Sequence, residues 1–160
     1  MMRVTIVAAG KIKEKYLAAG IGEFAKRIAP YAKLDIVEIE EEKMPEAPSA
    51  LEKEKTLDKE AQRLFKQIPS GSYLIVLDVG GKQLSSEELA DKFAGLTLGG
   101  RSHITFLIGS AFGLSDKLRK AADERLSFSK LTFTHQMIRL LLVEQIYRAF
   151  KILRGEPYHL

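Results

Sequence analysis

The residue types best suited to chemistry lie at the very end of the chain, where Tyr158 and His159 follow Gly155 and Pro157. An unperturbed histidine titrates near neutrality and can accept a proton. A tyrosine ring can stack on a nucleobase. Glycine and proline end the preceding helix and give the tail a direction. Chain ends are usually frayed, so the pair is either a proton-accepting site or a dispensable terminus.

Three apolar runs lead into segments suited to ligand binding. Ser72–Asp78 is followed by two glycines, His103–Ile108 by Gly109, and the run that begins at Leu126 by Phe128–Phe133. In open parallel sheets, ligands bind beyond the carboxyl ends of the strands, and glycine lets a ligand approach the backbone. Neither G-x-G-x-x-G nor the P-loop pattern occurs. The glycines therefore indicate either a ligand site or simple tight turns.

Other familiar catalytic patterns are missing from the sequence. The chain has no cysteine, and its histidines, His103, His135 and His159, lie far apart without zinc-ligand spacing. No serine stands in a G-x-S-x-G elbow. We therefore expect no metal site. His103 begins an apolar run and is expected to be structural, whereas His135 suits packing, capping or catalysis equally.

Strand-like and helix-like segments alternate along all 160 residues. The pattern predicts strands at 3–9, 33–39, 72–78, 103–108 and 126–129, and helices at 14–28, 49–67, 85–94, 116–122 and 135–153. Such alternation is typical of an α/β fold. We predict a single domain with a largely parallel sheet flanked by helices.

The last predicted helix is apolar around most of its circumference. From Met137 to Leu153, 12 of 17 residues are apolar. A surface helix usually has one apolar face, so this helix should contact two partners, its own sheet and a second copy of the chain in a homodimer. Arg139 falls on the apolar side, where a charge should be paired or face a ligand.

The charge of the chain is concentrated at its C-terminal end. Residues 125–160 hold six Lys/Arg and two Glu, an excess equal to the net charge of +4. A basic end suits a polyanion such as nucleic acid, although a solvated face is the alternative. No apolar run approaches the ~20 residues of a membrane span, and the N-terminus lacks the features of a secretory signal. We expect no membrane association and a cytoplasmic location.

The C-terminal block LSFSKLTFTHQMIRLLLVEQIYRAFKILRGEPYH resembles the signature of the RlmH-type ribosomal RNA methyltransferases of the SPOUT superfamily. MRVTIVAAGKIKEKY, VLDVGGKQLSSEELA and FLIGSAFG match the same family, so the resemblance covers essentially the whole chain. It implies a C-terminal trefoil knot, which local rules do not predict, and a homodimer. It also implies methyl transfer from S-adenosylmethionine to N3 of pseudouridine 1915 in helix 69 of 23S rRNA, on the assembled 70S ribosome.

This hypothesis gives roles to individual residues. Tyr158 would stack on or orient the target base, and His159 would accept the N3 proton. If the dimer places the tail of one chain over the cofactor of the other, Arg139, Arg148 and Arg154 would contact phosphate or complete the interface. The resemblance also supplies the expected cofactor residues. Family members commonly have a basic residue after the Tyr-His pair, where this chain has Leu160. The implied cofactor contacts are Leu77, Gly109, Phe128, Ser129, Lys130, Leu131, Thr132 and Phe133.

Two other functions stay open. A non-enzymatic ribosome- or RNA-binding module would show the same basic end without binding S-adenosylmethionine. A SPOUT enzyme acting on tRNA is the other alternative, although so small a chain offers little surface for reading a free RNA.

Overall fold

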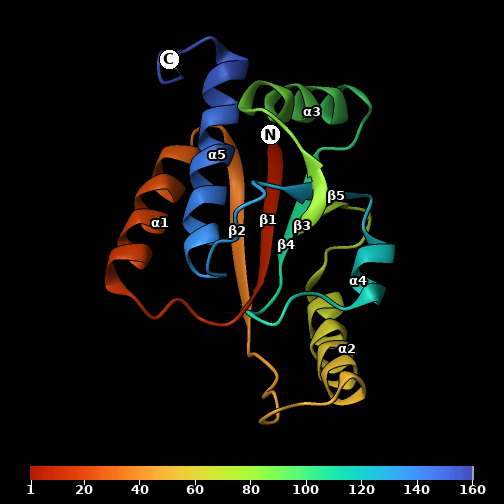
Figure 1. Cartoon of the computed structure of the whole chain (residues 1–160). Helices are drawn as coiled ribbons and strands as arrows, with labels where there is room; N and C mark the ends of the chain where they lie inside the picture. The colour runs from red at the N-terminus through yellow and green to blue at the C-terminus, as the bar shows by residue number, and fades with distance from the viewer. Residues whose placement is uncertain (160) are drawn as a thin grey trace.

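Five parallel strands form one sheet in the order β2-β1-β4-β3-β5 (Figure 1). The computed structural model describes residues 1–159. The strands are β1 (Met2–Ala9), β2 (Ala32–Ile39), β3 (Tyr73–Gln83), β4 (His103–Ile108) and β5 (Glu124–Ser127). The helices are α1 (Lys15–Ile28), α2 (Ala50–Gln67), α3 (Ser86–Leu98), α4 (Asp116–Ala121) and α5 (Met137–Arg154). The predicted α/β fold class is confirmed.

Helices cover both faces of this sheet. Successive residues of β1 point to opposite faces, so Ile6 packs in the core under α1, α3 and α5, whereas Val7 packs in the core under α2 and α4. Both residues are completely buried. Burial on both faces explains why the central strands are continuous apolar runs.

The helix α5 lies over the sheet between α1 and α3 (Figure 1). Its Tyr147 ring lies 5.9 Å from Phe24 of α1, and its Phe150 ring lies 5.6 Å from Phe93 of α3. The wide apolar circumference is therefore satisfied largely inside one chain. The inference that most of the apolar circumference of α5 needs a second copy is therefore too broad; the homodimer stays a prediction, for which the exposed apolar side chain of Met137 at the start of α5 is available.

The strand β3 continues past its predicted end at Asp78. Its pairing with β5 shifts register between Leu77 and Lys82. A Cβ on Gly81 would lie 2.6 Å from the carbonyl carbon of Arg125. This glycine therefore serves the close approach of two segments of the chain.

Capping boxes open two of the helices. Ser49 with Glu52 opens α2, and Ser85 with Glu88 opens α3. The trefoil knot stays a prediction that this sheet order allows. Within residues 1–159, no helix combines the length and the apolar character needed to cross a membrane.

Candidate functional site

A cavity of about 340 Å³ opens where β3, β4 and β5 end. Most of its wall comes from three segments at this edge of the sheet, 77–79, 108–114 and 126–133, and Arg119, His135 and Ile138 add to it. Parallel strands bring their carboxyl ends to one edge, which is why segments far apart in sequence meet here. The volume is within the usual range for a small-molecule site.

Seven of the eight residues assigned to the cofactor line this cavity. The exception is Lys130, which is exposed and does not line it. The seven are Leu77, Gly109, Phe128, Ser129, Leu131, Thr132 and Phe133.

The segment after β5 is shaped by its own serines. Ser127 Oγ donates a hydrogen bond to the carbonyl oxygen of Ser129 (3.0 Å), and Ser129 Oγ accepts one from the N–H of Leu131 (3.0 Å). These short-range bonds hold a turn that strand periodicity does not predict. The turn places the Phe128 and Phe133 side chains in the cavity wall.

The loop after β4 packs tightly against itself. A Cβ on Gly109 would lie 2.8 Å from the carbonyl oxygen of Gly113 and 2.6 Å from Leu114 Cδ2. Gly113 itself adopts φ 99°, a conformation that favours glycine. A side chain at Gly109 would therefore distort this loop of the cavity wall.

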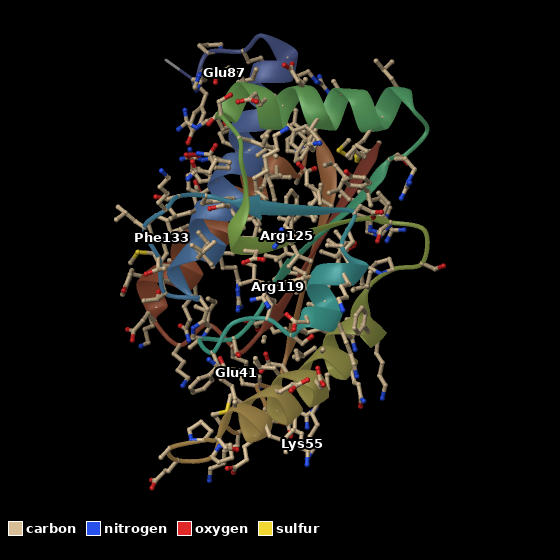
Figure 2. The ribbon with its side chains drawn as sticks, turned by 45° about the vertical axis from the view of Figure 1, so that its right-hand side comes forward. Glu41, Lys55, Glu87, Arg119, Arg125 and Phe133 are labelled. Atoms are coloured by element: carbon tan, nitrogen blue, oxygen red, sulfur yellow. The ribbon has the colours of Figure 1, made fainter. Side chains whose placement is uncertain are left out.

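A charged cluster borders the cavity at the end of the apolar part of β3. The Oδ2 atom of Asp78 accepts hydrogen bonds from Arg119 Nε (3.1 Å) and Arg125 Nη1 (3.2 Å). Figure 2 shows the two arginines side by side. Burial alone would raise the pKa of Asp78, but the N–H of Gly80 and the two arginines outweigh it and hold the pKa below its ordinary value.

Sequence reasoning missed this cluster because its members are 41 and 47 residues apart. The one available signal was an aspartate directly at the end of an apolar strand. Of the three, Asp78 and Arg119 line the cavity.

Ser110 adds a buried polar group to the cavity wall, with an exposed fraction of 7%. It lies beside the buried carboxylate of Glu60. Burial raises the pKa of Glu60, and the neighbouring Ser110 opposes that shift.

His135 connects the cavity to the acidic loop after β2. His135 lines the cavity, and its Nε2 atom lies 2.9 Å from Glu41 Oε1. Glu41 is labelled below the two arginines in Figure 2. His103 has a structural role, as expected, because its Nε2 atom bonds Thr5 Oγ1 at 2.9 Å.

Arg139 is packed where no RNA can reach it. It is completely buried, with Nη1 2.6 Å from Glu38 Oε2 and Nη2 donating to the carbonyl oxygen of Gly10 (3.0 Å). Of the two expectations for this residue, the paired charge is confirmed. The prediction that Arg139 contacts RNA is wrong, because the guanidinium is already used inside the fold.

The other two arginines are more accessible. Arg148 binds Glu144 one turn away (2.9 Å) and keeps a side chain that is 22% exposed. Arg154 is exposed at the end of α5, with its guanidinium 5.2 Å from the ring centroid of Tyr31. Arg154 remains a candidate for contact with phosphate, whereas Arg148 already has Nε and Nη2 on Glu144 and Nη1 beside His159.

The terminal Tyr-His pair does not line the cavity of its own chain. His159 lies against Glu87 at the start of α3, and Tyr158 packs on Tyr147 of α5. In Figure 2, Glu87 lies at one end of the molecule, away from the two arginines at the cavity. The fold therefore brings the predicted cofactor residues together but not the predicted proton acceptor. Leu160 lies outside the described residues.

A second hollow of about 280 Å³ adjoins the first and shares Phe128 and Phe133 with it. Leu84 and Leu89 near the start of α3 and Leu141 on α5 complete its apolar wall. The chain between Phe128 and Leu141, two residues that line this hollow, carries three exposed apolar side chains, Leu131, Phe133 and Met137. Gathered apolar surface of this kind is typical of an interaction face.

Comparison with known proteins gives consistent matches over the full length. Residues 2–159 match a family model described as "Predicted SPOUT methyltransferase". The chain is 54% identical over 158 residues to the ribosomal RNA large subunit methyltransferase H of Halothermothrix orenii, and 51% identical over 158 residues to that of Acetivibrio thermocellus; each alignment covers 99% of both proteins.

Among solved structures, the chain is similar to the tRNA (m1G37) methyltransferase of Aquifex aeolicus, with a TM-score of 0.54 and 14% identity. That match covers 99% of this chain and 74% of the other. A likeness at this identity concerns the fold alone.

Proposed function

Because the chain belongs to the SPOUT methyltransferase family, we propose that it transfers a methyl group from S-adenosylmethionine to N3 of pseudouridine 1915 in 23S rRNA. The observation that carries this proposal is the cavity at the ends of β3, β4 and β5, which is lined by seven of the eight residues assigned to the cofactor. The names of the full-length relatives support rRNA as the substrate.

The residues of the cavity fit S-adenosylmethionine chemically. Leu77, Ile108 and Phe128 offer an apolar wall for the adenosine part. Arg119 uses Nε and Nη1 on Asp78 and Asp116, which leaves Nη2 for an anionic group. When bound, the cofactor supplies an electrophilic methyl group on a positively charged sulfur.

The chain has to hold the base and remove a proton from N3. This N–H is weakly acidic, so a base of modest strength suffices, and a histidine suits that requirement. We propose His159 as the proton acceptor and Tyr158 as the residue that orients the base. Correct orientation of the reacting atoms contributes several kcal/mol to catalysis, about 7–11 kcal/mol at best.

The place of the tail supports a composite site in a homodimer. Tyr158 and His159 dock on α3 and α5 of their own chain, away from its cavity. A second copy seated on the exposed apolar side chains Leu131, Phe133 and Met137 would bring the tail of one chain to the cavity of the other. Arg154 would then be free to contact phosphate of the ribosome, a substrate that implies a cytoplasmic location, and Arg148, which already contacts Glu144, Tyr158 and His159, would complete the interface.

The deciding experiment uses ribosomes from a strain that lacks the modification. Incorporation of labelled methyl groups is compared on 70S particles, 50S particles, free 23S rRNA and tRNA, and the modified nucleotide is mapped. We expect methylation of the 70S particle at N3 of pseudouridine 1915. Methylation of tRNA instead would favour the tRNA-modifying alternative. Calorimetry that detects no S-adenosylmethionine binding would favour the non-enzymatic RNA-binding module.

A further inference from the structure

The C-terminal tail is anchored along its length. Gly155 ends α5 in a left-handed conformation, with φ 63°. The next residue, Glu156, accepts hydrogen bonds at Oε2 from Tyr31 (3.0 Å) and from Lys151 Nζ (2.8 Å). These contacts tie the start of the tail to α5 and to the residue before β2. The segment up to His159 is thus a docked element and not a frayed end.

The Tyr158 ring continues this anchoring. It packs edge-on against Tyr147, with ring centroids 4.8 Å apart. The guanidinium of Arg148 covers it, with Cζ 4.8 Å from the ring centroid. The two contacts fix the backbone from which His159 projects.

Both ring nitrogens of His159 have a partner. Nε2 lies 2.5 Å from Glu87 Oε1, and Nδ1 lies 3.1 Å from Arg148 Nη1. An arginine can only donate hydrogen bonds, so Nδ1 must present its lone pair to Arg148. The proton of the neutral ring is therefore on Nε2, which donates to the Glu87 carboxylate.

Glu87 and Arg148 are both held in the charged form that this arrangement needs. The pKa of Glu87 is lowered by the backbone N–H of Glu87 itself and by the contact with His159. Arg148 is fixed by Glu144, which accepts from its Nη2 at 2.9 Å and from its Nε at 3.3 Å. The Nη1 group is left to point at the histidine.

We propose that Glu87 and Arg148 are positioning residues for His159, which fix the direction of its ring and keep its lone pair on Nδ1. The role rests on the function proposed above, in which His159 accepts the N3 proton. Nothing in the sequence suggested Glu87, since it lies 72 residues from His159.

The proton transfer then balances as follows. The N3–H bond breaks and a Nδ1–H bond forms, while the methyl–sulfur bond breaks and the methyl–N3 bond forms. The cofactor is left as a neutral thioether, and the imidazolium keeps its Nε2–H on Glu87 until water takes the extra proton. For this step the hydrogen bond between Arg148 Nη1 and His159 Nδ1 must break, so that Nδ1 can accept the proton of the substrate. The hydrogen bonds to Glu144 keep the guanidinium of Arg148 nearby.

The contact is poorly suited to a merely structural role. The side chain of Glu87 is 58% exposed and that of His159 is 30% exposed. Exposed ion pairs contribute little to folding stability. Removing Glu87 should therefore leave the melting temperature almost unchanged while it affects the state of the histidine.

The first test reads the tautomer directly and needs no activity. In the full-length protein with ¹⁵N-labelled histidine, we expect His159 to show the Nε2–H tautomer by NMR, assigned by its loss in His159→Ala. In Glu87→Ala and in Arg148→Met, the His159 signals should move to the average of a free imidazole. The control is Asp91→Ala, an exposed acid one turn further along α3, which should leave the signals unchanged.

The second test measures methylation of ribosomes by the same variants. Glu87→Ala should lower kcat about tenfold, the cost of losing one oriented hydrogen bond, with KM and S-adenosylmethionine affinity unchanged. Glu87→Gln, which keeps an acceptor oxygen, should recover most of the rate. In a His159→Ala background, Glu87→Ala should have no further effect.

Three results would overturn the proposal: an Nδ1–H tautomer in the native protein, His159 signals indifferent to Glu87→Ala, or fully additive losses in the double variant. Absence of ribosome methylation by the native protein would refute the proposed function, whereas the tautomer measurement would still decide how His159 is held.

Discussion

Replacing Arg139 by alanine tests whether this arginine stabilises the fold or binds RNA. The substitution removes two hydrogen bonds from a charged donor, to Glu38 and to the carbonyl oxygen of Gly10. It also removes a completely buried side chain. Hydrogen bonds to charged groups contribute about 1.5–3 kcal/mol each, and a buried methylene contributes about 0.8 kcal/mol.

We expect the loss of stability to be smaller than the sum of these contributions. The Glu38 side chain is 33% exposed, so water can hydrate its carboxylate once the arginine is removed. We therefore expect Arg139→Ala to lower the free energy of unfolding by about 3 kcal/mol. For a chain of this size, that corresponds to a fall in the melting temperature of about 6–12 °C.

Urea unfolding followed by circular dichroism measures the change, and binding to ribosomes is measured in parallel at a temperature where the variant is folded. Arg154→Ala, at an exposed position on the same helix, is the control and should leave the unfolding midpoint unchanged. Wild-type stability in Arg139→Ala together with weaker ribosome binding would refute the assignment of Arg139 to the fold.

Four further predictions concern the tail, the RNA, the dimer and the cluster at Asp78. Deleting residues 158–160 should leave S-adenosylmethionine affinity intact and lower ribosome methylation by orders of magnitude, and His159→Ala alone should cost about 10²-fold; full activity of the truncated enzyme would remove the pair from the site. Ribosome affinity should fall steeply between about 50 and 200 mM salt. Arg154→Gln should reduce the slope of log affinity against log salt concentration by about one, whereas Lys33→Gln should not change it. An affinity independent of salt would argue against phosphate contacts. Met137→Asp should yield monomers by sedimentation while Leu98→Asp does not, and an unchanged mass in both would exclude this face. The pKa of Asp78 in the folded protein lies below its ordinary value of 3.8. Ionised Asp78 therefore stabilises the protein above that pH, and this contribution is lost as the pH falls through the folded pKa. The difference in unfolding free energy between wild type and Asp78→Asn should disappear in acid, and a difference that persists there would have another cause.

The cofactor side of the site could be predicted because it follows from a local rule. Continuous apolar runs mark strands buried on both faces, and a parallel sheet brings their carboxyl ends together. Leu77, Gly109 and Phe128 follow or end three such runs, and the structure collects them at one cavity. The resemblance to a known family named the same residues without using this geometry.

Contacts between distant segments were beyond sequence reasoning. The polarity pattern of α5 shows how much of it is apolar but not what covers it, so the pattern does not reveal that α1 and α3 cover much of this surface. Ile146, completely buried in one chain, would for this reason report on folding and not on dimerisation. The partner of Arg139 is 101 residues away in the sequence, and no periodicity reveals such a pairing.

The separation of the tail from the cavity within one chain has a consequence for how activity depends on enzyme concentration. If each reaction centre needs a cavity from one chain and a tail from another, dilution below the dimer dissociation constant abolishes turnover while every chain stays folded. Specific activity would then rise with protein concentration before it levels off. A mixture of two inactive variants, one with a damaged cavity and one without its tail, would also regain turnover, because a hybrid pair contains one intact centre.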